Sequence, residues 1–581
     1  MAKLVVDQRR IKELFQDKRA DFLIPDYQRP YAWGEAECQT LWDDVLAFTI
    51  PDNDCDKFDD NDEYFLGPIV TFKNEQGKME VIDGQQRLTT LMLLLRAFYP
   101  CFEKMEDKAS RTTRENIEQC IWKTDQFGTP DMSALKIDSE VASDRDKGEF
   151  MEILKSGAVQ EGQKSIYAAN YRFFVQKIDE FIRDYSGYLP YLATRIMQNC
   201  ILLPIEAESQ DTALRIFSTL NDRGKPLSDS DIFKAQFYKF YTGLGKKDDF
   251  IQRWKELEEL CERVFHPTTG TPMDELFTRY MYYVRAKMGI KQSTTEALRK
   301  FYEKDGYALL KDQQTFENLV VLAHFWDDVY SQNVERFSDE VLRSLFVLLY
   351  APNGMWTYLV SVYFMQNRDE KGMLDNGAFA VFLDKITGFI WTYAVTNPGV
   401  NALRTPVYAE MVNIVNDIPV TFAEYRFDAE KVRGMFANFS FHNARPITKS
   451  MLMWWAFQNE GQPLLSAETA FEIEHIYARN RQNIEQSLKD SRSLEALGNK
   501  AVLEKKINIR AADYRFGDKK KYYLGFTNLR NQRKDGTKNV ELVKIAETYS
   551  DFTEEEIQER ERRMMDAFIS FLQSNGLTNE G

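Results

Sequence analysis

The pattern of hydrophobic and polar residues predicts short strands and one apolar helix within the first hundred residues. The runs YFLGPIVTF (64–72) and MEVI (79–82) have the length and composition of strands, and the polar KNEQGK between them predicts a turn. The second strand leads directly into DGQQRLTTLMLLLRAF (83–98), whose apolar content predicts a helix. Upstream, two prolines in DFLIPDYQRPYAW (21–33) indicate an extended loop, and a helix is expected to begin near Glu35.

The rest of the chain has mainly the spacing of amphipathic helices. Apolar residues predict a helix over about 213–220, the polar NDRGKP breaks it, and Ser228 with Asp231 form a capping box for the next helix. The stretch 246–438 has few strand signals, and helical segments such as DEVLRSLFVLLY and GAFAVFLDKITGFIWTYAV dominate it. Beyond it, ITKSMLMWWAFQ predicts a helix and FEIEHIY a short strand. We therefore predict an α+β, mainly helical fold with three domains, 1–245, 246–438 and 439–581.

Composition and cysteine content narrow the class of protein. A chain of 581 residues with 44% hydrophobic and 28% charged residues is typical of ordered globular proteins. The six cysteines form no CxxC pair, which argues against a disulfide framework or a cysteine zinc site and favours a reducing cytoplasm. The apolar run Leu91 to Leu95 is far shorter than the roughly 20 residues that span a bilayer, so we expect no membrane span and no signal peptide.

Charge is distributed unevenly along the chain. The net charge of −15 argues against a nucleic-acid coat protein or a polybasic membrane binder. Residues 500–540, however, contain 12 Lys or Arg and four acidic residues, a net charge of +8. Such a segment could lie against a polyanion, or it could be a solvated basic surface paired with acids elsewhere in the fold.

His475 is the strongest candidate for acid–base chemistry among only four histidines. It follows Glu474 at the end of a predicted strand, and Asn499 and Asn508 come later in that order. Hydrolysis of a phosphodiester needs a base to activate water and a hard cation to neutralise the leaving oxygen. We therefore predict His475 as the general base, Asn499 as the residue that holds its segment, and Glu474 with Asn508 as oxygen ligands of Mg²⁺ or Mn²⁺. A lone histidine beside a strand is usually structural, but the joint pattern favours function.

The DGQQR turn is the second candidate site. Gly84 exposes backbone N–H groups at the start of a helix, where the macrodipole favours a phosphate. Asp83 could hold a cation, Arg87 could reach a nucleotide phosphate, and Thr89 or Thr90 could assist. Gln85 and Gln86 could orient water or phosphate oxygens. Alternatively, the same residues form a helix cap with Arg87 in a structural ion pair.

Two polar loops could complete this second site. Arg29 lies in YQRPYAW, and Asn221 and Arg223 lie in NDRGKP, each between apolar elements. We predict nucleotide or DNA contacts for these three residues. Turn chemistry at Asn221 is the alternative.

The motifs of the two ends together resemble known families. FEIEHIYARN, LEALGNKAVLEKKIN and FTEEEIQERERRMMDAF, within about 439–572, resemble the GmrD-type HNH nuclease domain, also called His-Me finger or ββα-metal. IPDYQRPYAW, YFLGPIV, VIDGQQRLTTLMLLLRA and IFSTLNDRGKPLSDSDIFKAQ, within about 1–245, resemble the GmrS-type domain, whose fold is related to ParB and sulfiredoxin. The commoner family form has a proline two residues after the histidine-isoleucine pair, whereas this chain has Tyr477, Ala478 and Arg479 after it. Asn508 also replaces the final histidine of the HNH set.

The resemblance to single-chain GmrSD-like type IV restriction endonucleases, similar in layout also to SspE, implies a function. It implies an antiphage nuclease that recognises modified phage DNA and nicks or cuts it with Mg²⁺ or Mn²⁺. It further implies binding and hydrolysis of a nucleoside triphosphate (GTP, UTP, CTP or ATP) at the N-terminal domain. The alternatives are a non-cleaving sensor or regulator and a toxin that depletes nucleotides. The sequence leaves the oligomeric state open, with a homo-oligomer among the options.

Overall fold

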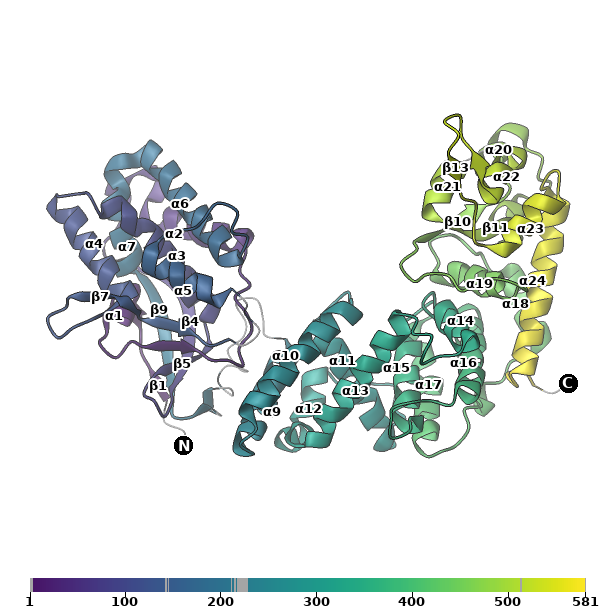
Figure 1. Ribbon diagram of the computed structural model, residues 1–581, viewed down its shortest axis with the longest axis horizontal. Helices are drawn as coiled ribbons and strands as arrows, with labels where there is room; N and C mark the ends of the chain where they lie inside the picture. The colour runs from purple at the N-terminus through teal and green to yellow at the C-terminus, as the bar shows by residue number, and fades with distance from the viewer. Residues whose placement is uncertain are drawn as a thin grey trace. The chain divides into compact units, whose positions relative to one another are not determined.

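The computed structural model describes residues 4–141, 144, 146–210, 212, 213, 216, 228–512 and 515–579. The chain forms two compact units, 1–256 and 257–581. The predicted α+β, mainly helical fold is confirmed, because both units contain more helical than strand residues and the first unit also contains a sheet (Figure 1). The predicted middle and C-terminal domains, 246–438 and 439–581, lie largely within the second unit.

The first unit is built on a mixed seven-stranded sheet with the order β1-β9-β4-β5-β3-β8, where β2 pairs with β9. Strands β4 and β5 are antiparallel, as expected of a hairpin, whereas β3 and β8 are added in parallel to one edge. The strands of this sheet are β1(Leu4–Val6), β2(Arg9–Arg10), β3(Phe22–Ile24), β4(Tyr64–Lys73), β5(Met79–Asp83), β8(Ile137–Ser139) and β9(Cys200–Ala207). A separate hairpin contains β6(Trp122–Thr124) and β7(Pro130–Leu135).

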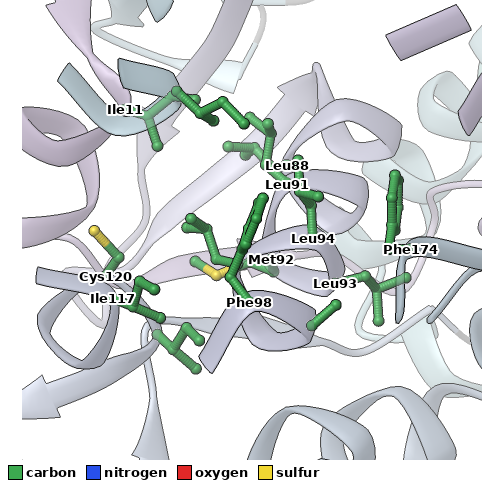
Figure 2. Close-up of a cluster of buried hydrophobic side chains, with 14 of the residues drawn as sticks. Ile11, Leu88, Leu91, Met92, Leu93, Leu94, Phe98, Ile117, Cys120 and Phe174 are labelled. Carbon is green, nitrogen blue, oxygen red and sulfur yellow. The ribbon is translucent and has the colours of Figure 1, made fainter. Parts of the chain in front are cut away.

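One apolar helix, α3(Gln85–Phe102), is central to the core of this unit. Its run Leu91 to Leu95 is at most 1% exposed, so the helix is covered on all sides. Figure 2 shows these side chains packed with Ile117 of α4 and Phe174 of α6. The other helices are α1(Ile11–Gln16), α2(Glu35–Thr49), α4(Lys108–Ile121), α5(Lys147–Ser156), α6(Ile166–Tyr185), α7(Leu189–Asn199), α9(Asp229–Gly243) and α10(Lys247–Val264).

The local predictions for this unit are largely confirmed. Strands form at both predicted runs, the helix α2 begins at Glu35, and α3 follows β5 after Gly84. Ser228 and Asp231 form the predicted capping box of α9. The helix expected over 213–220 falls mostly outside the described residues.

The second unit begins with a stack of helices. Aromatic residues fill its interior, and Trp326 and Trp391 are fully buried. The helices are α11(Pro272–Lys287), α12(Leu298–Tyr307), α13(Gln313–Tyr330), α14(Asp339–Leu348), α15(Met355–Asn367), α16(Asn376–Thr396), α17(Val400–Val415), α18(Ala429–Asn438) and α19(Pro446–Phe457). In the described part of the chain α16 alone is long and apolar enough to cross a membrane, but 67% of its apolar window is buried. It contacts α14, α18, α19 and α24, as a core helix does.

The end of the second unit has the order strand, strand, helix. β10(Phe471–His475) pairs antiparallel with β11(Lys500–Glu504), and α21(Lys505–Ala511) follows at once. The remaining elements are α20(Arg479–Glu485), α22(Phe516–Leu524), β12(Phe526–Thr527), β13(Arg533–Lys534), α23(Val540–Thr548) and α24(Glu554–Ser574). Their shared core includes Tyr477, Leu503 and Phe516. The predicted helix around 447–458 and the predicted strand at 471–477 are both confirmed, as α19 and β10.

Candidate functional site

His475 is the last residue of β10 and lies opposite Lys500, the first residue of β11. The pairing continues one step further, because the Ile476 N–H donates to the Asn499 carbonyl oxygen at 2.9 Å. The His475 residue is only 8% exposed. The two short strands therefore place a buried imidazole at the end of their pairing, where the connection 476–499 begins.

Asn499 locks the segment that follows His475. Its side-chain oxygen accepts from the Tyr477 N–H at 2.7 Å, and its amide nitrogen donates to the carbonyl oxygens of Tyr477 at 3.1 Å and Leu494 at 2.9 Å. Asn499 is fully buried, so these bonds satisfy polar groups that water does not reach. The structure thus places Asn499 where it can hold the candidate base, as its predicted role requires.

The His475 imidazole is neutral at physiological pH. Burial, with Lys500 and Arg479 nearby, lowers the pKa of His475 to about 4. Its Nε2 is shielded from solvent and has no hydrogen-bond partner in the described part of the chain. A neutral imidazole nitrogen without a partner is a proton acceptor in reserve.

Glu495 is the residue beside His475 that the sequence did not single out. One of its oxygens lies 3.5 Å from His475 Nε2 and 2.7 Å from the Arg479 guanidinium. Its other oxygen accepts from the Lys500 ammonium at 2.6 Å. Although burial opposes it, Lys500, His475 and Arg479 hold the pKa of Glu495 below its usual range. The carboxylate is therefore charged and could stabilise an imidazolium.

Glu474 lies in a separate buried ion pair. The Lys519 ammonium donates to its carboxylate at 2.8 Å and to the His475 carbonyl oxygen at 2.6 Å. The Tyr523 hydroxyl also bonds to this carboxylate. Asn508, the other predicted metal ligand, donates from its amide nitrogen to Glu472 Oε2 at 2.9 Å. Lys519 and Tyr523 therefore tie α22 to the strand that carries His475.

Glu474 and Asn508 carry oxygen atoms of the kind that a hard divalent cation prefers, but here Glu474 is paired with Lys519 and Tyr523, and Asn508 bonds to Glu472. Mg²⁺ prefers oxygen ligands and keeps several waters, so one carboxylate and one amide oxygen are enough protein ligands. An ion there competes with the Lys519 ammonium for the Glu474 carboxylate. Within the described residues no group of three or more His, Cys, Asp or Glu could hold a metal ion. An ion held by Glu474 and Asn508 would take its remaining ligands from water or substrate.

Arg560 of α24 supports the turn before β11. Its guanidinium donates to the carbonyl oxygens of Leu497, Gly498 and Lys500 and forms a buried ion pair with Glu541 at 2.7 Å. The sequence analysis included Arg560 only as part of the motif FTEEEIQERERRMMDAF and gave it no role. A charged residue on the apolar face of an amphipathic helix is the signal that could have identified it.

In the first unit, the two glutamines of DGQQR hold a neighbouring loop. The Gln86 side-chain oxygen accepts from the N–H groups of Ala32 at 2.7 Å and Trp33 at 3.2 Å, and its nitrogen donates to the Pro30 carbonyl oxygen at 3.1 Å. Gln85 donates to the Arg29 carbonyl oxygen at 3.3 Å. Both side chains are thus engaged with loop backbone, an arrangement that sequence reasoning did not anticipate.

Charged residues lie around the same turn. Gly84 is the N-cap of α3 with φ of 89°, a conformation that favours glycine, and it has no side chain to cap the helix. Burial raises the pKa of Asp83, while Arg87 and Arg29 oppose that shift. The Arg87 guanidinium donates to the Pro68 carbonyl oxygen at 2.8 Å.

The other predicted contacts of this site are only partly described. Asp231 lies near Arg29, since that arginine and Lys234 oppose the burial that raises the Asp231 pKa. Thr89 is buried, and the Thr90 hydroxyl bonds to the Tyr31 hydroxyl at 2.7 Å. Asn221 and Arg223 lie outside the described residues.

Two parts of the chain match known family models. Residues 11–238 match the family described as GmrSD restriction endonuclease, N-terminal domain, and residues 430–567 match the one described as GmrSD restriction endonucleases, C-terminal domain. The chain belongs to the GmrSD restriction endonuclease family. A comparison with curated proteins found no match. This GmrSD-like protein is therefore a type IV, modification-dependent restriction endonuclease whose substrate is DNA.

The basic segment of this GmrSD-family enzyme is divided between interior and surface. Lys500 and Lys519 are at most 1% exposed and serve internal ion pairs, so they are not available to a phosphate backbone. Arg530, Arg533 and Lys538 are exposed on the surface. Only part of the predicted +8 segment can therefore contact DNA.

Proposed function

We propose that this GmrSD-family enzyme breaks modified phage DNA by HNH-type hydrolysis at His475, under the control of a nucleoside triphosphate bound at the DGQQR turn. The observation that carries the proposal is the environment of His475. Its imidazole is held neutral at the end of β10, its Nε2 makes no hydrogen bond within the described residues and lies 3.5 Å from Glu495, and Asn499 fixes the segment that follows. Buried polar atoms are usually hydrogen-bonded, so a nitrogen that is not needs an explanation, and a chemical role provides one.

In the proposed reaction, Nε2 of His475 takes a proton from the attacking water while the phosphorus–oxygen bond of one strand breaks. Glu495 then stabilises the imidazolium that forms. Arg479 has a side chain that is 52% exposed, so we assign it to the phosphate. Glu474 and Asn508 would hold Mg²⁺ or Mn²⁺, which supplies charge neutralisation at the leaving oxygen.

The burial of Nε2 suggests how cutting is controlled. Nε2 is buried beside Glu495, which is itself paired with Arg479. Water can reach Nε2 only after this pair rearranges. An enzyme at rest in this state leaves unmodified host DNA intact, and DNA that draws Arg479 toward its phosphate opens the site.

The nucleotide part of the proposal assigns the phosphates to the start of α3. The uncapped helix N-terminus favours an anion, and Arg87 and Arg29 lie beside Asp83. Gln85 and Gln86 act there by holding the Arg29–Trp33 loop in place. Asn221 and Arg223 remain predicted contacts.

The test incubates purified protein with unmodified, glucosylated hydroxymethylcytosine and phosphorothioate DNA, with Mg²⁺ or Mn²⁺, and with or without each of the four triphosphates. Strand breaks and released phosphate are measured in the same reactions. We expect metal-dependent breaks on one modified DNA and phosphate release from one or more triphosphates. Phosphate release without breaks on any DNA would contradict the nuclease assignment and favour a sensor or a nucleotide-depleting toxin.

A further inference from the structure

A two-stranded hairpin projects from the body of the C-terminal part of the chain (Figure 1). Its strands are β12(Phe526–Thr527) and β13(Arg533–Lys534), and its tip is the run Asn528 to Gln532. Leu529 at this tip is 108% exposed, more than any other large apolar residue in the described part of the chain. Full burial of a leucine contributes about 1.5–3 kcal/mol relative to exposure in water, so a partner that covers Leu529 would gain this free energy.

The tip is rigid because one side chain organises it. The Asn528 side-chain oxygen accepts from the N–H groups of Arg530 at 3.0 Å and Gln532 at 2.9 Å. The Asn528 backbone N–H also donates to the Gln532 carbonyl oxygen at 3.0 Å. Leu529 is therefore presented in a fixed direction by its own turn, and a partner that receives it pays little ordering entropy.

The base of the hairpin is closely packed. Gly536 lies so near the Tyr523 carbonyl oxygen that a Cβ there would overlap it. The Thr537 N–H donates to that same carbonyl oxygen at 2.9 Å. The hairpin thus emerges from the end of α22 as a fixed extension.

Cations surround the apolar tip. Arg530, Arg533 and Lys538 are exposed and Lys534 is half-buried, while Asp535 is the one acidic residue of this stretch. Within the described ranges none of the four cations forms an ion pair. A surface of unpaired cations around a single apolar side chain fits a phosphate backbone with stacked bases beneath it.

The hairpin follows directly after α22, a helix whose side chains contact the candidate nuclease site. Tyr523 immediately precedes the last residue of α22, and its hydroxyl bonds to Glu474. Lys519, one turn earlier, bonds to Glu474 and to the His475 carbonyl oxygen. A force on the hairpin is therefore transmitted to Glu474 and to the backbone of His475, the proposed base.

We propose that this hairpin binds the minor groove of the DNA substrate and that Leu529 is inserted between two base pairs as a wedge. Arg530 and Arg533 bind the flanking phosphates, and the kinked duplex is presented to the His475 site. The inference rests on the proposed function for the place of the cut, but the wedge itself requires only that DNA is the substrate. Unstacking one step costs a few kcal/mol, and a base pair weakened or reshaped by modification lowers this cost.

The first unit offers a matched control. Phe127 lies in the turn between β6 and β7 and is 84% exposed. Its turn is organised in the same way, since Asp125 accepts from the Phe127 N–H at 2.8 Å. The residue that organises this turn is the acidic Asp125, whereas at the Leu529 tip it is the neutral Asn528, surrounded by cations. Phe127 therefore tests exposure of an apolar tip without the surrounding positive charge.

The test uses the full chain and short duplexes with 2-aminopurine, whose fluorescence rises when its stacking is lost, in unmodified, glucosylated hydroxymethylcytosine and phosphorothioate forms. Binding is measured at several salt concentrations without divalent metal. We expect a fluorescence rise with the wild-type protein on at least one modified duplex. Leu529→Ala should remove most of that rise and weaken binding several-fold, Leu529→Met should restore both, and Phe127→Ala should behave as wild type.

The charged residues have a separate signature. The double variant Arg530→Ala with Arg533→Ala should lower the slope of log K against log salt by about two. Leu529→Ala should leave that slope unchanged, because it removes no charge. No fluorescence rise on any duplex, or a rise unaffected by Leu529→Ala, would overturn the wedge.

Failure of the wedge and failure of the proposed nuclease site can be told apart. His475→Ala should abolish strand breaks and retain the fluorescence rise. A wild-type cutting rate in His475→Ala with a rise that depends on Leu529 would contradict the site and leave the wedge intact. A fluorescence rise in wild type that is unaffected by Leu529→Ala, with cutting lost in His475→Ala, would contradict the wedge and support the nuclease site.

Discussion

The DGQQR turn and the end of β10 look alike in sequence, since each has an acidic residue and other polar residues at the end of a short strand, Asp83 in β5 and Glu474 with His475 in β10. Their hydrogen bonding differs. The Gln86 side-chain oxygen accepts hydrogen bonds from two loop N–H groups, and its nitrogen donates to a loop carbonyl oxygen. His475 Nε2 makes no hydrogen bond in the described part of the chain, although Glu495 lies 3.5 Å away. Polar residues that are fully engaged hold a site together, whereas a buried polar atom held in reserve is where chemistry is expected.

The largest effect should come from His475. His475→Ala should lower the rate of strand breakage by about 10²–10⁴-fold, the usual contribution of a general base. Phosphate release from the nucleotide should be retained, because the DGQQR turn lies in the other unit. His442→Ala is the control, since His442 is an exposed histidine of the same unit. Equal losses in both variants would show that the effect is not specific to His475.

Glu495 should have the next largest effect. Glu495→Gln keeps the shape of the side chain but removes the charge that faces Nε2 at 3.5 Å. We expect kcat to fall about 10–100-fold, as for other residues that orient a reactive group, with little change in KM and partial recovery in Glu495→Asp. Glu485→Gln is the control, because Glu485 pairs with Arg481 and Arg515 instead. If Glu495→Gln cut DNA faster than wild type, Glu495 would only shield Nε2 of His475 and would not assist catalysis.

Gln86 should affect stability before chemistry. Gln86→Ala leaves the N–H groups of Ala32 and Trp33 without their acceptor, which should lower the free energy of unfolding of the first unit by about 1–3 kcal/mol. Gln176→Ala removes an exposed bond to Glu180 and should change it far less. Thermal or urea unfolding monitored in the first unit measures the difference. Similar changes in the free energy of unfolding for the two variants would contradict the role of Gln86 in holding the Arg29–Trp33 loop.

The smallest expected effect is that of pH on the cutting step. Nε2 acts in its neutral form, and because burial, Lys500 and Arg479 lower its pKa from 6.5 to about 4, it stays neutral as the pH falls from 8 to 5. The cutting rate at saturating metal should therefore be nearly constant over this range and decline as the pH approaches 4. A histidine with an ordinary pKa would lose most of its activity below pH 6. A decline centred near 6.5 would contradict the buried environment.

The local parts of this structure could be predicted from sequence, and the long-range parts could not. The hairpin β4–β5 and the helix α3 follow from adjacent residues, as does the capping box of Ser228 and Asp231. The loop held by Gln86 lies 54 residues away from it, and Lys519 lies 45 residues from Glu474. No periodicity encodes such pairings, because they depend on how the elements pack.

The same limit explains the residues of the candidate site. His475, Asn499 and Asn508 could be named because their types and order fit one chemistry. Glu495 could not be distinguished from other surface acids until β11 placed it beside His475. The basic segment shows the opposite case, since a count of charges did not reveal that Lys500 is buried inside the fold.

The most direct test of the two-site comparison measures strand breaks and released phosphate together for wild type, His475→Ala and Arg87→Ala, with Mn²⁺, each triphosphate and the panel of modified duplexes. We predict that His475→Ala loses breaks and keeps phosphate release, whereas Arg87→Ala loses phosphate release and, with it, the control of cutting. Wild-type cutting by His475→Ala would contradict the central claim that the base at the end of β10 performs the nuclease chemistry.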